Sequence, residues 1–522
     1  MHRNFVPSLK LTLLIVTLLI SGGLTVHTVA TERATAYAAP AFSCGDVSEI
    51  SNADCLALQD LYNATDGNRW TDKTDWLVTN TPCTWYGVTC GGGRVIELRL
   101  QSNGLKGTLP PTLSNLSALT WLELQYNTLS GEIPPGLGSL NQLTELSLYY
   151  NSLTGSIPPQ LGGLSNLNAL RLGHNKLTGN VPKELGALSN LTILGIDDNQ
   201  LTGPLPTALG NLTKLELFNA DLNQLNGTIP SIFGNFGNIW RLWLENNQFS
   251  GELPGQLGSL SKLRQFSVRN NALKDAIPST FTGLTALGKL DLGYNQFTAS
   301  GTALKNFLAA KDPDWADTQT IAPTNLTAAT VSANSIKLSW TPIVYTGDGG
   351  YYEIRAATTP GGPYTTQGAT TNKNSSNYTV SGLTPNTTYY FVVRSYTPAH
   401  GTQQNTLWSA FSNEASATTE NDTTLTPPTI VSTPETKALR GQAYAYSVIA
   451  NGSVPLTFSL PQNPLGMTID ANTGFISWTP ATVGAFAVTV KASNSVGANE
   501  QSFTITVNET PKITSAPLTS AN

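Results

Sequence analysis

A strict period of 24 residues constrains this chain more than any other feature. Counted in steps of 24, a leucine, isoleucine or valine opens each of nine units, and no insertion interrupts them. The units begin at Val95, Leu119, Leu143, Leu167, Leu191, Leu215, Ile239, Leu263 and Leu287. The ninth residue of every unit is asparagine, from Asn103 to Asn295. A repeat of this length predicts a solenoid, because one unit can bury its apolar side only by stacking on its neighbours.

Each unit contains an alternating apolar pair, such as Leu122 and Leu124. This alternation predicts a short strand in which both leucines are buried and Glu123 faces outward. We expect the asparagine in the turn after the strand, where its amide can satisfy backbone groups of adjacent coils. The return segment follows the pattern L-x-G-x-I-P, whose glycine permits a tight path and whose proline opposes a regular helix.

Over residues 95–298 the pattern resembles the leucine-rich repeat family, in the 24-residue form that is typical of plant receptors and occurs in some bacteria. The preceding segment CTWYGVTC (83–90) is similar to the cysteine-paired N-terminal cap of that family. Residues 54–70 predict the helix and turn of this cap. The apolar face of the helix is predicted to contain Leu56, Leu58, Leu61 and Tyr62. Residues 301–319 depart from the repeat, and their helical spacing of apolar residues predicts a closing cap.

Four cysteines, Cys44, Cys55, Cys83 and Cys90, lie close together near the start of the chain. In an oxidising compartment such an even set predicts two disulfides. Three pairings are open, and we favour the local one, Cys44 with Cys55 and Cys83 with Cys90. A metal site is the alternative, but the spacings lack the C-x-x-C pattern and no histidine lies nearby in sequence.

The N-terminal residues 1–38 have the pattern of an export signal. Arg3 and Lys10 flank the start, and an apolar run covers 11–20. Small-residue cleavage sites follow at 29–30 and, in A-x-A form, at 36–38. An uncleaved membrane anchor is the alternative, although the apolar run is short for a bilayer span. No later segment is long enough to span a membrane. We therefore expect a secreted, extracellular or cell-surface protein with no membrane span.

Two further modules follow the solenoid. LTPNTTYYFVVRSY (383–396) resembles the fibronectin type III signature L-x-P-x-T-x-Y, and the resemblance covers about 321–420. It implies a tyrosine corner in which the Tyr389 hydroxyl bonds back to the chain, and a core position for Trp340. Residues 428–508 resemble bacterial immunoglobulin-like or cadherin-like modules.

Two details of the last module leave alternatives open. Asp470, Asn472 and Gly474 could suggest calcium, but this short pattern is more typical of a hairpin turn. PKITSAPLTSA (511–521) matches PTIVSTPETKA (428–438) at six of eleven places. The tail is therefore interpreted as the start of an incomplete further module.

The predicted fold class is mostly β: a leucine-rich repeat solenoid of nine 24-residue repeats with caps, followed by two β-sandwich domains. The predicted boundaries are 1–38 for the signal peptide, 39–94 for the N-terminal cysteine-containing cap, 95–298 for the solenoid, 299–320 for the C-terminal helical cap, 321–420 for the fibronectin type III domain, 421–427 for a linker, 428–508 for the immunoglobulin-like domain and 509–522 for the incomplete module.

Composition and residue chemistry argue against several function classes. Charged residues make up only 12% of the chain and the net charge is −5 with no basic block, which argues against nucleic-acid binding. No Ser–His–Asp arrangement or phosphate-binding glycine loop is suggested. A glycosidase that uses Asp197, Asp198 or Asp221 is the enzymatic alternative, but an open solenoid face lacks the dry pocket that acid–base catalysis needs. We expect no enzymatic activity, no cofactor and no metal.

Variable outward positions of the predicted strands are the best candidates for binding. Aromatic side chains on a rigid sheet are good anchors because they bury area with little loss of rotamer freedom. The candidate ligand-binding residues are Trp121, Tyr126, Tyr149, Tyr150, His174, Asp197, Asp221, Arg241 and Trp243. These residues predict a monomeric recognition or adhesion protein that binds a protein or carbohydrate on its concave face. The alternative is a structural stalk or matrix component without a specific ligand.

Overall fold

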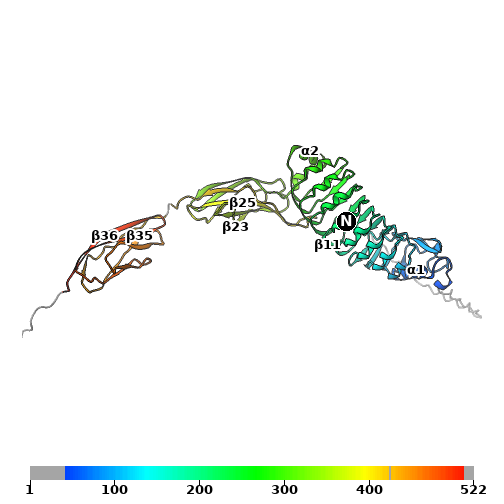
Figure 1. Cartoon of the computed structure of the whole chain (residues 1–522), viewed down its shortest axis with the longest axis horizontal. Coiled ribbons are helices and arrows are strands. Elements are labelled where there is room, and N and C mark those ends of the chain that lie inside the picture. Colours follow the sequence, from blue (N-terminus) through cyan, green and yellow to red (C-terminus); the bar gives the residue numbers. More distant parts are fainter. Residues whose placement is uncertain (1–41, 423–424, 511–522) are drawn as a thin grey trace, which may run out of the picture.

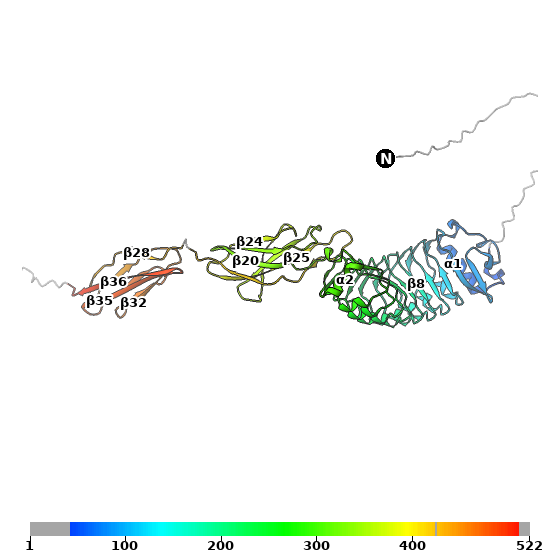
Figure 2. The same cartoon turned by 90° about the horizontal axis from the view of Figure 1, so that it is seen from above.

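The computed structural model describes residues 42–422 and 425–510. Figures 1 and 2 show a solenoid followed by two β-sandwiches in one extended row. The predicted signal peptide lies outside the described residues, and so does most of the predicted incomplete module, 511–522. The mostly-β fold class is confirmed.

One ten-stranded sheet runs the length of the solenoid. Its strands are β1 (Val88–Gly91), β2 (Arg94–Arg99), β4 (Trp121–Glu123), β6 (Glu145–Ser147), β8 (Ala169–Arg171), β10 (Ile193–Gly195), β12 (Leu217–Asn219), β14 (Arg241–Trp243), β16 (Gln265–Ser267) and β18 (Lys289–Asp291). From β2 onward they pair in parallel with a register of one repeat, so Leu122 lies beside Leu146. Leu122 and Leu124 are fully buried whereas Glu123 is only partly buried, as predicted.

The return side of each coil carries a second, short strand, which is followed by a 3-10 turn in the first eight coils and by α2 after the ninth. The strands are β3 (Lys106–Thr108), β5 (Thr128–Glu132), β7 (Ser152–Thr154), β9 (Thr178–Asn180), β11 (Gln200–Pro204), β13 (Gln224–Gly227), β15 (Gln248–Gly251), β17 (Ala272–Ala276) and β19 (Gln296–Thr298). The glycine of the L-x-G-x-I-P pattern is needed where it stands, because Gly131 has φ +74°, a left-handed conformation that favours glycine. A proline then precedes each 3-10 turn from η4 (Pro111–Asn115) to η11 (Ser279–Gly283).

The repeated asparagines form a hydrogen-bond ladder inside the solenoid. Asn127 Oδ1 accepts from Leu105 N at 3.0 Å, and Asn127 Nδ2 donates to Leu100 O at 2.9 Å, so one side chain joins two coils. The same pattern recurs up to Asn295. Beyond it Gln319 takes over the role for the ninth coil: its Oε1 accepts from Phe297 N and its Nε2 donates to Leu292 O. The structural role predicted for the asparagines is confirmed.

Caps cover both ends of the solenoid core (Figure 1). At the start, α1 (Asn52–Ala64) follows the 3-10 turn η1 (Cys44–Asp46), and the disulfides are Cys44–Cys55 and Cys83–Cys90, which confirms the local pairing. The α1 helix buries Leu58 and Leu61, but Leu56 is 43% exposed, so its predicted place on the apolar face was wrong. At the other end α2 (Thr302–Lys311) lies over the last coil and packs against η11.

The first sandwich has two sheets. One contains β20 (Thr324–Ser332), β21 (Ser335–Thr341) and β24 (Asn377–Ser381); the other contains β22 (Tyr351–Ala357), β23 (Thr365–Ala369), β25 (Thr388–Thr397), β26 (Leu407–Trp408) and β27 (Ala415–Thr418). Trp340 is buried in its core. The Tyr389 hydroxyl accepts a hydrogen bond from Thr384 N at 3.0 Å, which confirms the predicted tyrosine corner.

The second sandwich is built from nine strands. They are β28 (Thr429–Ile430), β29 (Lys437–Leu439), β30 (Tyr444–Ser447), β31 (Ala450–Asn451), β32 (Thr457–Gln462), β33 (Thr468–Ile469), β34 (Phe475–Trp478), β35 (Gly484–Asn494) and β36 (Gly497–Asn508). Asp470 Oδ1 accepts from Asn472 N at 2.9 Å and from Thr473 N at 2.8 Å. The carboxylate thus stabilises its own hairpin turn, the interpretation preferred from the sequence.

The loop between β25 and β26 joins the first sandwich to the solenoid. Gln403 Nε2 donates to Asn271 O at 3.2 Å and to Tyr294 O at 2.8 Å. Asn405 Nδ2 donates to Asn247 O at 2.7 Å. The loop therefore uses backbone carbonyl groups in the turns of repeats seven to nine, and the contact places the sandwich against the C-terminal end of the solenoid.

Candidate ligand-binding site

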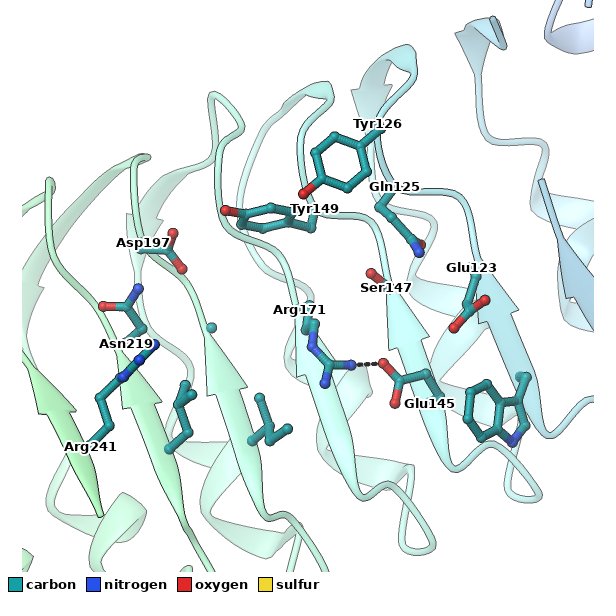
Figure 3. Close-up of a pocket in the computed structure, with 14 residues that line it drawn as sticks. Glu123, Gln125, Tyr126, Glu145, Ser147, Tyr149, Arg171, Asp197, Asn219 and Arg241 are labelled. Atoms are coloured by element: carbon teal, nitrogen blue, oxygen red, sulfur yellow. Dashed lines mark ion pairs between the residues drawn. The ribbon is translucent and has the colours of Figure 1, made fainter. Parts of the chain in front are cut away.

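The ten-stranded sheet is hollowed into a groove of about 580 Å³ that crosses repeats two to seven (Figure 3). Its walls and floor come from outward positions of β4 to β14. The lining residues are Trp121, Glu123, Gln125, Tyr126, Glu145, Ser147, Tyr149, Arg171, Ile193, Gly195, Asp197, Leu217, Asn219 and Arg241. Because the register is one repeat, equivalent outward residues stand side by side at the ~4.8 Å spacing of adjacent strands.

The middle of the groove is apolar and its margins are charged. Ile193 and Leu217 stand side by side, and Gly195, which has no side chain, lies in the same strand as Ile193. Arg171 pairs with Glu145, an ion pair drawn in Figure 3. Burial lowers the pKa of Arg171, while the carboxylate of Glu123 opposes that effect. A ligand that crosses the groove would meet an apolar centre between charged ends.

Two carboxyl groups, Asp197 and Asp221, lie next to each other in adjacent repeats. Burial raises the pKa of both, and for Asp221 burial together with the neighbouring charges of Asp197 and Glu245 raises it to about 7. Asp197 leans over Gly173, where an added Cβ would lie 2.5 Å from Asp197 Oδ1. His174 Nε2 lies 3.6 Å from Asp197 Oδ2. The Asp197 carboxylate thus occupies the space that a side chain at Gly173 would fill.

An aromatic cluster borders the groove where the strands of repeats two to four end. Tyr126, Tyr150 and His174 precede the ladder asparagines and all have left-handed backbones, with φ between 52° and 57°. The rings of Tyr150 and His174 stack with centroids 4.0 Å apart, and those of Tyr126 and Tyr150 stack at 5.1 Å. Tyr149 meets Tyr150 edge to face at 4.8 Å. The rings therefore support one another and form a continuous rim.

The two tryptophans predicted as anchors face outward but are half-buried. The Arg99 guanidinium lies 4.2 Å from the ring centroid of Trp121. Arg241 covers Trp243 in the same way at 4.2 Å. Such cation–π contacts stabilise the pair and cover an aromatic face. Neither indole is an open platform.

Three buried acceptor atoms on this face have no hydrogen-bond partner among the described residues: Gln125 Oε1, Asn219 Oδ1 and Asp221 Oδ1. The Trp243 Nε1 donor is also unpartnered. A buried polar group without a partner costs roughly 1–3 kcal/mol. A ligand that donates hydrogen bonds here would remove that cost.

The structure brings most of the predicted site residues together. Those that line the groove are Trp121, Tyr126, Tyr149, Asp197 and Arg241. Tyr150, His174 and Trp243 lie beside it in contact with lining residues, and Asp221 lies two residues after the lining residue Asn219. The sequence reasoning missed Arg171, Glu145 and the apolar centre. The 24-residue period already assigns each of them to an outward position of a strand. They were missed because the prediction favoured aromatic residues at those positions.

Two further findings concern the described residues alone. Within them, no group of three or more histidine, cysteine, aspartate or glutamate side chains is placed to hold a metal ion. The helices in the same part of the chain are all too short or too polar to cross a membrane.

Family models match four parts of the chain. Residues 51–91 match the leucine rich repeat N-terminal domain, and single leucine rich repeats match at 94–116, 118–140, 142–164, 190–212 and 238–260. The first part of the chain is therefore a leucine-rich repeat domain with an N-terminal cap. The chain also carries a fibronectin type III domain at 321–409 and, at 427–508, a match to the family described as Putative Ig domain.

Two similar proteins match only part of the chain. It is 38% identical over 76 residues to the receptor protein kinase WSS1 of Oryza sativa subsp. japonica, a match that covers 14% of this chain and 8% of the kinase. It is 34% identical to the leucine-rich repeat ectodomain of the receptor kinase GASSHO1/SCHENGEN3 from Arabidopsis thaliana, with a TM-score of 0.43, over 47% of this chain and 33% of that one.

A plant ice-binding protein is also similar in structure. It is 28% identical with a TM-score of 0.33, and the match covers 44% of this chain and 90% of that protein. The matches to the kinase and to the receptor ectodomain span less than half of those proteins.

Proposed function

We propose that the concave groove binds a polypeptide segment and that the protein is a secreted or cell-surface recognition protein without catalytic activity. The groove itself carries this proposal. It combines an apolar centre at Ile193 and Leu217, charges of both signs, and buried acceptors that lack partners within the described part of the chain. A polypeptide offers apolar side chains, charged side chains and backbone N–H donors at a matching spacing.

The aromatic residues favour a polypeptide over a carbohydrate. A sugar ring is commonly held by stacking on an open aromatic face. Here guanidinium groups cover Trp121 and Trp243, and the rings of Tyr150 and His174 stack on each other. Arginine-covered indoles and a tyrosine rim instead offer edges, hydroxyl groups and apolar area, which suit side chains of a protein ligand.

The remaining features agree with a role outside the cytoplasm. Two disulfides in the cap are typical of oxidising compartments. The sandwiches extend in a row from the C-terminal end of the solenoid (Figure 1). They would act as spacers that hold a monomeric recognition domain away from its point of attachment.

The test compares retention of the full chain on a combined peptide and glycan array with that of the Trp121→Ala, Tyr149→Ala, Trp243→Ala triple variant. Tyr86→Ala, an exposed tyrosine in the cap, is the control. We expect peptide retention to fall at least tenfold in the triple variant and to be unchanged in the control, with far-UV circular dichroism showing an intact fold. Equal retention by all three proteins would reject the proposal in favour of a structural stalk, and retention on glycans alone would reject the ligand class.

A further inference from the structure

Acidic residues occupy one row of the concave face only at repeats five, six and seven. The seventh place of these repeats holds Asp197, Asp221 and Glu245. The same place in the other repeats holds Gln101, Gln125, Tyr149, Gly173, Arg269 and Gly293. Three carboxyl groups therefore follow one another at the strand spacing of ~4.8 Å, although like charges placed side by side are unfavourable.

The outer members of this row have side-chain partners among the described residues, whereas Oδ1 of the central member has none there. Asp197 lies beside His174, and Glu245 accepts a hydrogen bond from the Ser267 hydroxyl. Asp221 forms none of the ion pairs found among the described residues. Its side chain is only 9% exposed, and its Oδ1 has no hydrogen-bond partner in that part of the chain.

A second unpartnered acceptor lies on the same strand end. Asn219 Oδ1 is buried without a partner two residues before Asp221, and Asn219 lines the groove (Figure 3). Both atoms accept hydrogen bonds, so a ligand group that pairs with them must donate. Because carboxylates stand on both sides of Asp221, a positively charged donor is favoured over a neutral one.

The groove also offers room for the stem of such a group. Gly195 has no side chain, and a Cβ added there would lie 3.4 Å from Asp197 Oδ1. The Asp197 carboxylate therefore borders bare backbone, over which the stem of a ligand side chain can approach it. Ile193 and Leu217 lie beyond Gly195 and would receive a neighbouring apolar side chain of the ligand.

We propose that Asp197 and Asp221 receive the ammonium or guanidinium group of a lysine or arginine side chain of the ligand, with its aliphatic stem lying over Gly195. The ligand is then a polypeptide with a basic residue next to an apolar one. This inference rests on the proposed function, since it assigns the ligand chemistry of the same groove.

The experiment uses an array of twelve-residue peptides that are random except at one central place, which holds lysine, arginine, norleucine or glutamate. The full chain is the probe. It is compared with the double variant Asp197→Asn, Asp221→Asn, which keeps the side-chain shape and removes the charge. Asp275→Asn, an exposed aspartate on β17 of the other sheet, is the matched control.

We expect the lysine and arginine peptides to be retained at least tenfold more than the norleucine and glutamate peptides, which is the ratio expected for a charge-assisted hydrogen bond. The double variant should lose this preference and the control should keep it. Equal retention of lysine and norleucine peptides, or an unchanged preference in the double variant, overturns the inference. If the triple alanine variant of the concave face also retains peptides as well as the parent does, the proposed function fails. If only the preference for lysine and arginine peptides is missing, the proposed function stands and this inference alone fails.

Discussion

Replacing Asn247 by alanine should destabilise the solenoid far more than any surface substitution. Asn247 is fully buried in the ladder. Its Oδ1 accepts from Leu225 N at 2.9 Å, and its Nδ2 donates to Ala220 O at 2.9 Å and to Glu245 O at 3.1 Å. Alanine leaves Leu225 N buried without a partner, which costs roughly 1–3 kcal/mol, and removes two further hydrogen bonds at about 1 kcal/mol each. The expected loss of unfolding free energy is about 3–5 kcal/mol.

Position along the ladder provides an internal comparison. Asn127 makes equivalent hydrogen bonds but its side chain is only half-buried, so water can replace part of what is lost. Asn127→Ala should therefore cost about 1–2 kcal/mol. Asn166 lies on the surface and donates one hydrogen bond, to Asn141 O at 2.7 Å, so Asn166→Ala should cost less than about 1 kcal/mol.

Two measurements check these values on the full chain. Urea unfolding gives the loss of stability, and amide hydrogen exchange shows whether opening starts at the expected place. We expect the Leu225 amide to exchange faster in the Asn247→Ala variant than in the other two. If Asn247→Ala costs no more than Asn166→Ala, the ladder does not stabilise the stacking of coils and the reasoning is wrong.

Three further predictions concern charge and the joint between domains. Asp221→Asn removes a carboxyl group whose pKa burial and neighbouring carboxylates raise to about 7. Because this pKa is raised, the parent protein loses stability as the pH rises from about 4 to above 7. In urea unfolding the variant should therefore be more stable than the parent by about 2 kcal/mol at pH 8, and this difference should shrink toward pH 4. A difference that does not change with pH would contradict this prediction. Gln403→Ala combined with Asn405→Ala removes side-chain contacts between the first sandwich and the solenoid, and small-angle scattering should show a wider spread of domain orientations; an unchanged curve would mean that other contacts hold the joint. Lys373 is fully buried and pairs with a buried aspartate, so Lys373→Met should destabilise the first sandwich by about 3–5 kcal/mol in thermal unfolding, whereas Lys491→Met on the surface should cost almost nothing.

The solenoid could be predicted from the sequence because each coil contacts only its neighbours. A period of 24 residues therefore assigns a place to every residue, and the buried pair Leu122 and Leu124, the outward Glu123 and the ladder residue Asn127 all lie where the pattern predicts. The tyrosine corner at Tyr389 was equally local, since its hydroxyl bonds to the backbone five residues away. Leu56 was mispredicted because a helical period does not say how wide the covered face is.

The chemistry of the groove was decided by the tertiary structure. The sequence shows that outward positions vary, but not that Arg171 pairs with Glu145 or that Asp197 leans over Gly173. Nor does it show that Asp221 Oδ1 has no hydrogen-bond partner among the described residues. These features depend on side-chain directions and burial across neighbouring coils, which a one-dimensional pattern does not contain.

The contact between the domains was also invisible in the sequence. Gln403 bonds to the backbone of Asn271, which is 132 residues away in the chain. Nothing local distinguishes this glutamine from others in polar loops. The sequence by itself determined how the coils repeat, because that depends on contacts between adjacent units; only the folded chain decided which distant groups meet, because that depends on how the stacked coils curve and where the next domain is docked.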